Sequence, residues 1–266
     1  MAAPEPMLST PARSWPAGSD WIMQPKWDGF RILVAVDTAG RIRAWSRHGT
    51  SLTGSLGDLL DPFTHVAPSS LFDGELVAVA SRDGHPVQDF AAVTRAVLSS
   101  DAASTPQLRL VAFDLLELAG QDLRQRPWVH RDAQLRDALP ATDRVRLVQS
   151  TTASALEHDA IVALGFEGTI LKRPASTYRP GRQTTWRKYK ARHRATAILR
   201  SLRPGRDGNT YAVCELDCRP ILALASASLQ PAVGEPVELV YSRVDADGTL
   251  REVRVTHPQP STSNSR

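Results

Sequence analysis

Short apolar stretches bounded by polar turn residues recur in the first half of the chain, a pattern typical of β-strands. The stretch FRILVAVD, residues 30–37, predicts one strand, and RIRAWSR, residues 41–47, predicts its hairpin partner after a short turn. Two further strands are predicted at LFDGELVAVA and RLVAFDLLEL, residues 71–80 and 109–118. The first half of the chain is therefore expected to form largely antiparallel sheet.

Two later stretches space their apolar residues as helices do. VHRDAQLRDAL at residues 129–139 predicts one helix, and ASALEHDAIVALG at residues 153–165 predicts a second that stops at its final glycine. EGTILKR and TWRKYKAR, residues 167–173 and 185–192, predict two more strands. Together these elements predict a mixed α+β domain over residues 21–192.

The two ends of the chain differ from this domain in composition and in the pattern of predicted elements. Residues 1–20 contain four prolines and are expected to form a loosely ordered arm. After Arg194, five short strands are predicted between glycine, proline and aspartate turns: ATAILRSL, YAVCELD, ILALASA, PVELVYSR and LREVRVTH. Such a series suits a small β-barrel of the OB-fold type over residues 193–258, followed by a disordered tail at residues 259–266.

Composition places the chain among ordinary globular proteins, with 42% hydrophobic and 23% charged residues in 266. A formal net charge of +4 suits a polyanionic partner, although many basic proteins bind no nucleic acid. No apolar run suggests a signal peptide or a membrane span, so a cytoplasmic protein is expected. Two cysteines, Cys214 and Cys218, complete no zinc site and are expected in a strand.

Lysine is rare in this chain, and its positions are informative. Only four of the 32 basic residues are lysine, at positions 26, 172, 188 and 190, which leaves 28 arginines (32 minus 4). Codon bias explains the arginines but not the clustering of the lysines. An amine can lose its proton and attack an electrophile, whereas a guanidinium stays protonated. The pattern indicates chemistry that requires an amine.

Six motifs follow one another in a fixed order around these lysines. They are KWDGFR at residues 26–31, SRHG at 46–49, FDGEL at 72–76, FDLLEL at 113–118, EGTILKR at 167–173 and KYK at 188–190. In this order they resemble the covalent nucleotidyltransferase superfamily, and specifically the compact bacterial ATP-dependent DNA ligases related to the ligase module of end-joining repair. The resemblance implies an adenylation domain followed by an OB-fold.

Lys26 is the expected nucleophile. An amine attacks the α-phosphorus of ATP only in its neutral form, which neighbouring positive charges favour. Lys188 and Lys190 flank Tyr189 on a predicted strand, so both side chains project to one face and could lie over the phosphates. Phosphoryl transfer also needs a metal ion to balance the charge on the phosphate oxygens.

The resemblance assigns roles to further residues. It implies that Glu75 and Glu167 contact Mg²⁺, with Mn²⁺ as a possible substitute, and that Asp73 on the same strand face is secondary. Phe113 would stack on the adenine, although an isolated phenylalanine in a strand is more often a core residue. Asp28 would orient the reacting groups during sealing.

Three other positions complete the expected nucleotide site. The resemblance implies that Arg31 and Arg47 hold the ribose and phosphate, or the 5′-phosphate of a nick. Gln24 stands where family members often have Glu, and its amide oxygen could still accept a hydrogen bond from the adenine amino group.

The C-terminal motif departs from the family pattern. Arg251 matches its start, but His257 stands near an expected arginine, and the closing Asp and Lys are missing. Because this motif assists self-adenylylation in the family, its departure from the pattern leaves the speed of that step open.

The expected function is sealing of nicked double-stranded DNA through a lysyl-AMP and an adenylated 5′-phosphate. The expected protein is a monomer in the bacterial cytoplasm, associated with the nucleoid, without a membrane partner, and possible partners are end-joining or base-excision repair proteins. An RNA ligase or a capping-type guanylyltransferase also carries the KxDG motif. A non-catalytic DNA-binding relic of a ligase is the alternative from another class.

Overall fold

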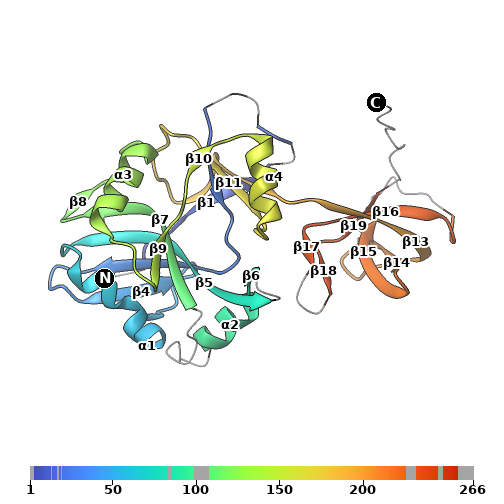
Figure 1. The fold of residues 1–266 in the computed structure, drawn as a ribbon, viewed down its shortest axis with the longest axis horizontal. Helices are drawn as coiled ribbons and strands as arrows, with labels where there is room; N and C mark the ends of the chain where they lie inside the picture. The colour runs from blue at the N-terminus through green and yellow to red at the C-terminus, as the bar shows by residue number, and fades with distance from the viewer. Residues whose placement is uncertain are drawn as a thin grey trace. The chain divides into compact units, whose positions relative to one another are not determined.

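The chain forms two compact units in the computed structural model, Met1–Tyr189 and Lys190–Arg266, each described separately below (Figure 1). The structure describes residues 3–12, 14–16, 18, 20–82, 85–98, 108–225, 232–244 and 248–256. The first unit contains two β-sheets and the helices, and the second contains a barrel. The expected boundary at residue 192 lies a few residues beyond the division between the units.

The first unit is built on a five-stranded and a seven-stranded sheet. The five-stranded sheet has the order β1 (Met7–Pro11), β12 (Gly181–Lys190), β11 (Gly168–Lys172), β2 (Ile22–Pro25) and β10 (Thr151–Thr152). The seven-stranded sheet has the order β4 (Ile42–Ser46), β3 (Phe30–Val36), β5 (Ser70–Arg82), β7 (Leu108–Leu118) and β8 (Gln121–Asp122), with β6 (His85–Gln88) on β5 and β9 (Val145–Leu147) on β7.

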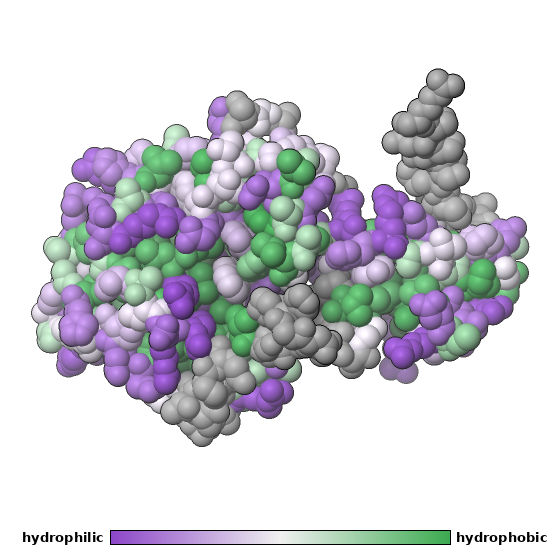
Figure 2. Space-filling view, in the orientation of Figure 1, coloured by the Kyte–Doolittle hydropathy of each residue, from purple (hydrophilic) through white to green (hydrophobic). Residues whose placement is uncertain are grey.

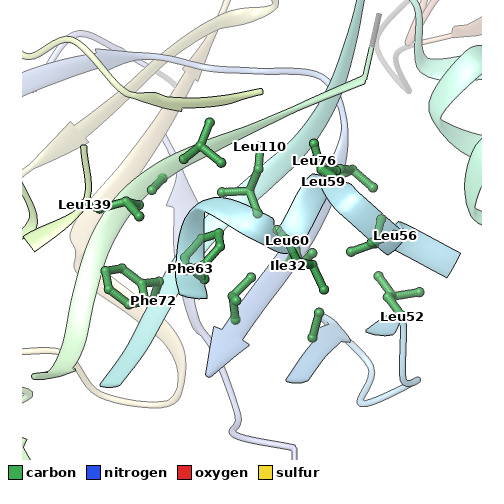
Figure 3. Packing of buried hydrophobic residues seen from close by; sticks show 14 of the residues in the cluster. Ile32, Leu52, Leu56, Leu59, Leu60, Phe63, Phe72, Leu76, Leu110 and Leu139 are labelled. Carbon is green, nitrogen blue, oxygen red and sulfur yellow. The ribbon is translucent and has the colours of Figure 1, made fainter. Parts of the chain in front are cut away.

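Both faces of the seven-stranded sheet are covered, which explains why its central strands β3, β5 and β7 are largely apolar. One face packs against α1 (Thr53–Leu56), the 3-10 helix η1 (Gly57–His65) and α2 (Phe90–Leu98) in the largest core cluster. Figure 3 shows Phe63 and Leu60 of η1 packed with Phe72 of β5 and Leu110 of β7. The opposite face, through Leu33 of β3, joins a second cluster that contains residues of the five-stranded sheet.

The sequence predicted the strands β3, β4, β5, β7, β11 and β12 and the helices α3 (Trp128–Ala138) and α4 (Ala155–Ala163) correctly. It missed α1, η1 and α2, and in the first two a glycine or a proline interrupts the helical spacing. On the face shown in Figure 2, hydrophilic side chains are interspersed with hydrophobic ones in each unit. No helix among the described residues combines the length and the apolar character needed to cross a membrane.

The prediction of a loosely ordered arm over residues 1–20 is wrong for its central part. Strand β1 pairs in parallel with β12, and Met7 is fully buried. The amide of Met7 donates to the hydroxyl of Tyr178 at 2.9 Å. Prolines do not prevent this pairing, because β1 lies at the edge of its sheet and Pro11 is its last residue.

The second unit is a closed barrel, as the sequence predicted. The strand order is β13 (His193–Pro204), β14 (Thr210–Leu216), β15 (Arg219–Ala225), β19 (Arg254–Thr256) and β16 (Pro236–Tyr241). The expected single strand LREVRVTH is interrupted, because Glu252 adopts φ +53°, a left-handed conformation that breaks a strand. Its first part, β18 (Leu250–Arg251), pairs with β17 (Arg243–Val244) outside the barrel.

Two smaller expectations about the second unit have different outcomes. Cys214 is buried in the barrel core, but Cys218 is exposed in the turn between β14 and β15, so the expectation of two strand cysteines is half wrong. The predicted tail at residues 259–266 and His257 lie outside the described residues.

An ion pair buried in the first unit fixes α3 on the seven-stranded sheet. The side chains of Arg131 and Asp114 are both fully buried and form two hydrogen bonds, of 2.7 and 2.9 Å. The Arg131 guanidinium also donates to the carbonyl oxygens of Arg126 and Ser176. Each buried charge therefore depends on its partner for compensation.

We expect Arg131→Met to lower the free energy of unfolding by about 3–5 kcal/mol, because it leaves the Asp114 carboxylate buried without its partner. Urea unfolding followed by circular dichroism measures the change. The matched control is Arg144→Met, which breaks an exposed pair with Asp58 and should cost at most about 1 kcal/mol. Equal losses in the two variants would contradict this account.

Candidate active site

A pocket of about 600 Å³ lies in the first unit and is lined from both of its sheets. The strands β3, β5 and β7 supply Arg31, Glu75 and Phe113, and the strands β2, β11 and β12 supply residues from the other side. The predicted site residues that line it are Gln24, Lys26, Arg31, Arg47, Glu75, Phe113 and Lys188. The tertiary structure therefore gathers seven of the predicted positions around one cavity of nucleotide size.

Lys26 lies on the loop that crosses from β2 of one sheet to β3 of the other. Its backbone amide donates to the carbonyl of Gly168 at 2.8 Å, and its Nζ forms an ion pair with Glu167. Gly29 of the same loop approaches β5 so closely that a Cβ atom would lie 2.1 Å from the carbonyl oxygen of Leu76. The glycine of KWDGFR is thus required by close packing of the loop on the sheet.

Arg31 stands in the pocket wall with its charge balanced by a buried acid. Its guanidinium pairs through two nitrogens with the carboxylate of Asp73, which is fully buried. The same guanidinium donates to the carbonyl of Met7 at 3.2 Å, and the Tyr178 hydroxyl donates to Asp73 at 2.6 Å. Asp73 therefore has a structural role, since it holds Arg31 and Tyr178 together. The contribution of Tyr178 could not be predicted from the sequence, because this residue lies in a loop far from Asp73 along the chain.

Glu75 follows Asp73 by two positions on β5 and faces Arg31 across the ladder with β3, as the strand prediction required. Burial raises the pKa of Glu75 from its ordinary value of 4.5 to about 7. The positive charges of Arg31 and Lys26 oppose this shift, whereas Asp73 and Asp28 add to it. The carboxyl is therefore poised to gain or lose a proton near neutral pH.

Phe113 lies among cationic side chains. The Arg31 guanidinium carbon is 4.5 Å from the centre of its ring, and the Lys172 ammonium nitrogen is 4.9 Å from it. Lys172 is buried, donates to the Phe113 carbonyl at 3.0 Å and lies 4.0 Å from the ring centre of Trp186. Burial lowers the pKa of Lys172 to about 7. Lys172 is one of only four lysines in the chain, and this rarity is the sequence feature that could have indicated a role for it, although none was predicted.

Gln24 and Arg47 occupy contrasting positions on the pocket wall. Gln24 is buried, and its amide nitrogen donates to the Ser150 hydroxyl at 3.0 Å, so its amide oxygen could accept a hydrogen bond from a ligand. Arg47 is exposed, in the turn after β4. The buried amide and the exposed cation fit the base end and the phosphate end of a nucleotide.

Four predicted residues do not line this pocket. Glu167 does not line the pocket but forms an ion pair with Lys26, which does. Asp28 does not line it either, and its backbone amide donates to the side chain of Gln88 at 2.6 Å. Lys190 belongs to the second unit and pairs with Glu252 at 2.5 Å. Arg251 lies on the β17–β18 hairpin of that unit. Lys188 and Lys190 both belong to β12, two positions apart, as the strand prediction required, but only Lys188 lines the pocket.

The carboxylates of the site are compatible with a hydrated divalent cation. No group of three or more His, Cys, Asp or Glu side chains suited to a metal is present in the described part of the chain. Mg²⁺ usually takes only one or two protein carboxylates together with water and substrate phosphates. Glu75 and Glu167, both electrostatically linked to Lys26, satisfy that requirement.

Comparison with known proteins agrees with this geometry. A family model described as the ATP dependent DNA ligase domain matches residues 6–190. The chain therefore belongs to the ATP-dependent DNA ligase domain family, and the resemblance inferred from its six motifs is confirmed.

Individual relatives support the same assignment. The chain is 32% identical over 206 residues to a probable DNA ligase of Anaeromyxobacter sp. (strain Fw109-5), covering 73% of this chain and 39% of that protein. It is 31% identical over 188 residues to the multifunctional non-homologous end joining protein LigD of Pseudomonas aeruginosa, covering 69% and 22%. This chain thus spans less than half the length of these relatives.

A solved structure shows the same fold. The ligase domain of LigD from M. tuberculosis superposes with a TM-score of 0.62 at 22% identity, covering 97% of this chain and 95% of that one. The expected α+β architecture with a terminal barrel is confirmed by this likeness and by the strand order.

Glu75→Gln should change how stability depends on pH. Because folding raises the pKa of Glu75 to about 7, its contribution to stability is present at low pH and is lost as pH rises from about 4.5 to about 7. We expect the glutamine variant to gain stability relative to wild type across this interval and to keep a constant advantage above it. Urea unfolding without divalent metal measures the difference, and a difference independent of pH would contradict the assignment.

Proposed function

We propose that this protein is an ATP-dependent DNA ligase that adenylylates itself on Lys26 and then seals nicked duplex DNA. The observation that carries the proposal is the position of Lys26, which lines a nucleotide-sized pocket beside Glu167 and Glu75. The family membership supports the same reaction.

In the first step, the neutral amine of Lys26 attacks the α-phosphorus of ATP, and the bond to pyrophosphate breaks. The nitrogen gives up a proton as the phosphoramidate forms, and Glu167 is placed to accept it. Arg47 and Lys188 line the pocket and would balance the charge of the phosphates. Burial of the adenine end against Phe113 and Gln24 would fix the nucleotide for in-line attack.

Magnesium, when bound, would neutralise charge that develops on the phosphate oxygens and the pyrophosphate. Glu75 and Glu167 would hold it directly or through water, and Mn²⁺ would be an alternative ion. The raised pKa of Glu75 means that this residue offers its ionised form increasingly as pH rises through about 7.

In the later steps, the 5′-phosphate of the nick takes AMP from Lys26, and the 3′-hydroxyl then displaces AMP to close the strand. Asp28 would orient the reacting groups in these steps. The name of the Pseudomonas aeruginosa relative, LigD, suggests end joining as one context for the activity. We propose that the protein acts as a monomer on DNA in the cytoplasm.

Lys26→Arg should abolish labelling of the protein by α-labelled ATP, because the guanidinium stays protonated and cannot attack phosphorus. Incubation with Mg²⁺ and a denaturing gel detect the adduct in wild type. Labelling by GTP instead of ATP would favour a guanylyltransferase, and labelling of the Lys26→Arg variant would exclude Lys26 as the nucleophile. No adduct in wild type would favour a non-catalytic relic.

Arg251→Ala should slow formation of the enzyme–AMP adduct by about tenfold or more, the scale expected for loss of one contact to a phosphate charge. Sealing of a nick that already carries AMP should change little, because self-adenylylation is bypassed. Rapid-quench measurements of both steps provide the test. Arg203→Ala, which removes an exposed arginine of β13, serves as the control. Adduct formation at the wild-type rate would show that the C-terminal motif has lost this role.

A further inference from the structure

We propose that Gln88 is a positioning residue that holds the loop of the nucleophile against the segment that carries Glu167. The loop comprises residues 26–29, between β2 and β3. This inference rests on the proposed function, since it concerns the geometry of Lys26 and Glu167 during self-adenylylation.

The loop makes few backbone contacts of its own, because it lies outside the ladders of both sheets. Lys26 bonds through its amide to Gly168, and Gly29 packs against the backbone of Leu76. Between them, the amide of Asp28 donates to the side-chain oxygen of Gln88 at 2.6 Å. Gln88 therefore supplies the acceptor for the central amide of the loop.

The amide nitrogen of the Gln88 side chain bonds to the segment that carries Glu167. The amide nitrogen of Gln88 donates to the carbonyl oxygen of Gly165 at 3.4 Å. Gly165 follows α4, adopts φ +88° and stands two residues before Glu167. One glutamine thus joins two segments that lie 60 and 77 residues away from it in sequence.

These two segments are also joined by the ion pair between Lys26 and Glu167. That ion pair cannot survive self-adenylylation, because the nitrogen loses its positive charge when it bonds to phosphorus. The hydrogen bonds of Gln88 involve neutral groups and do not depend on the charge of Lys26. Gln88 can therefore keep the loop and Glu167 in place through the step at which the ion pair is lost.

The position of Gln88 predicts a specific kinetic signature. Gln88 is the last residue of β6 and is not among the residues that line the pocket, so we expect its substitution to leave nucleotide binding unchanged. Its loss should lower the rate constant of self-adenylylation and leave the ATP concentration for half-maximal rate nearly unchanged. A change in general stability would instead reduce the fraction of active protein.

The test compares wild type with Gln88→Leu and Gln88→Glu in single-turnover labelling by α-labelled ATP and Mg²⁺ at several ATP concentrations. Gln88→Leu removes both hydrogen bonds and should slow the maximal rate about 10- to 100-fold, the scale of a 1 Å misplacement. Gln88→Glu keeps an acceptor for the Asp28 amide but loses the donor to Gly165, so a smaller slowing of about three- to tenfold is expected.

Gln121→Leu is the matched control, because Gln121 is an exposed glutamine on β8, and its rate should equal that of wild type. Thermal unfolding by circular dichroism identifies any variant that fails to fold. A folded Gln88 variant whose maximal rate stays within twofold of wild type would overturn the inference while the proposed function stands. Absence of the adduct in wild type would overturn the proposed function itself.

Discussion

The buried carboxylate of Asp73 is the group on which the geometry of the pocket depends. A fully buried charge is costly unless it is paired and hydrogen-bonded, and here Arg31 and Tyr178 provide both forms of compensation. Arg31 comes from the seven-stranded sheet, Tyr178 from the connection between β11 and β12, and Met7 of the edge strand bonds to both. One acid thus joins the two sheets and the N-terminal strand beneath the nucleotide site.

This network also determines how charge is distributed around Lys26. The negative charge of Asp73 balances the positive charge of Arg31. The ion pair also holds the Arg31 guanidinium in place beside Phe113 in the pocket wall. Glu75 and Lys172 lie close by, and burial moves the pKa of each toward 7, upward for the acid and downward for the amine. Both groups can thus adjust their charge near neutral pH when a polyanion enters the site.

The pocket belongs entirely to the first unit, whereas two of the residues expected to serve the phosphates belong to the second. Lys190 is paired with Glu252, the residue whose left-handed conformation separates β18 from the barrel strand β19. Arg251 immediately precedes it. Each unit therefore carries some of the residues of the predicted motifs, and Arg251 of the second unit lies on a hairpin outside the barrel ladder.

The sequence by itself determined the strands around residues 30–37 and 71–80, helices α3 and α4 and the barrel, and it singled out Lys26 as the candidate nucleophile, because local periodicity and short motifs carry that information. It could not reveal that β1 is an edge strand, that Tyr178 reaches Asp73 across 105 positions, or that Gln88 bonds to Asp28. These contacts depend on burial and on pairing between distant segments. No local pattern encodes such pairing, so only the tertiary structure decided them.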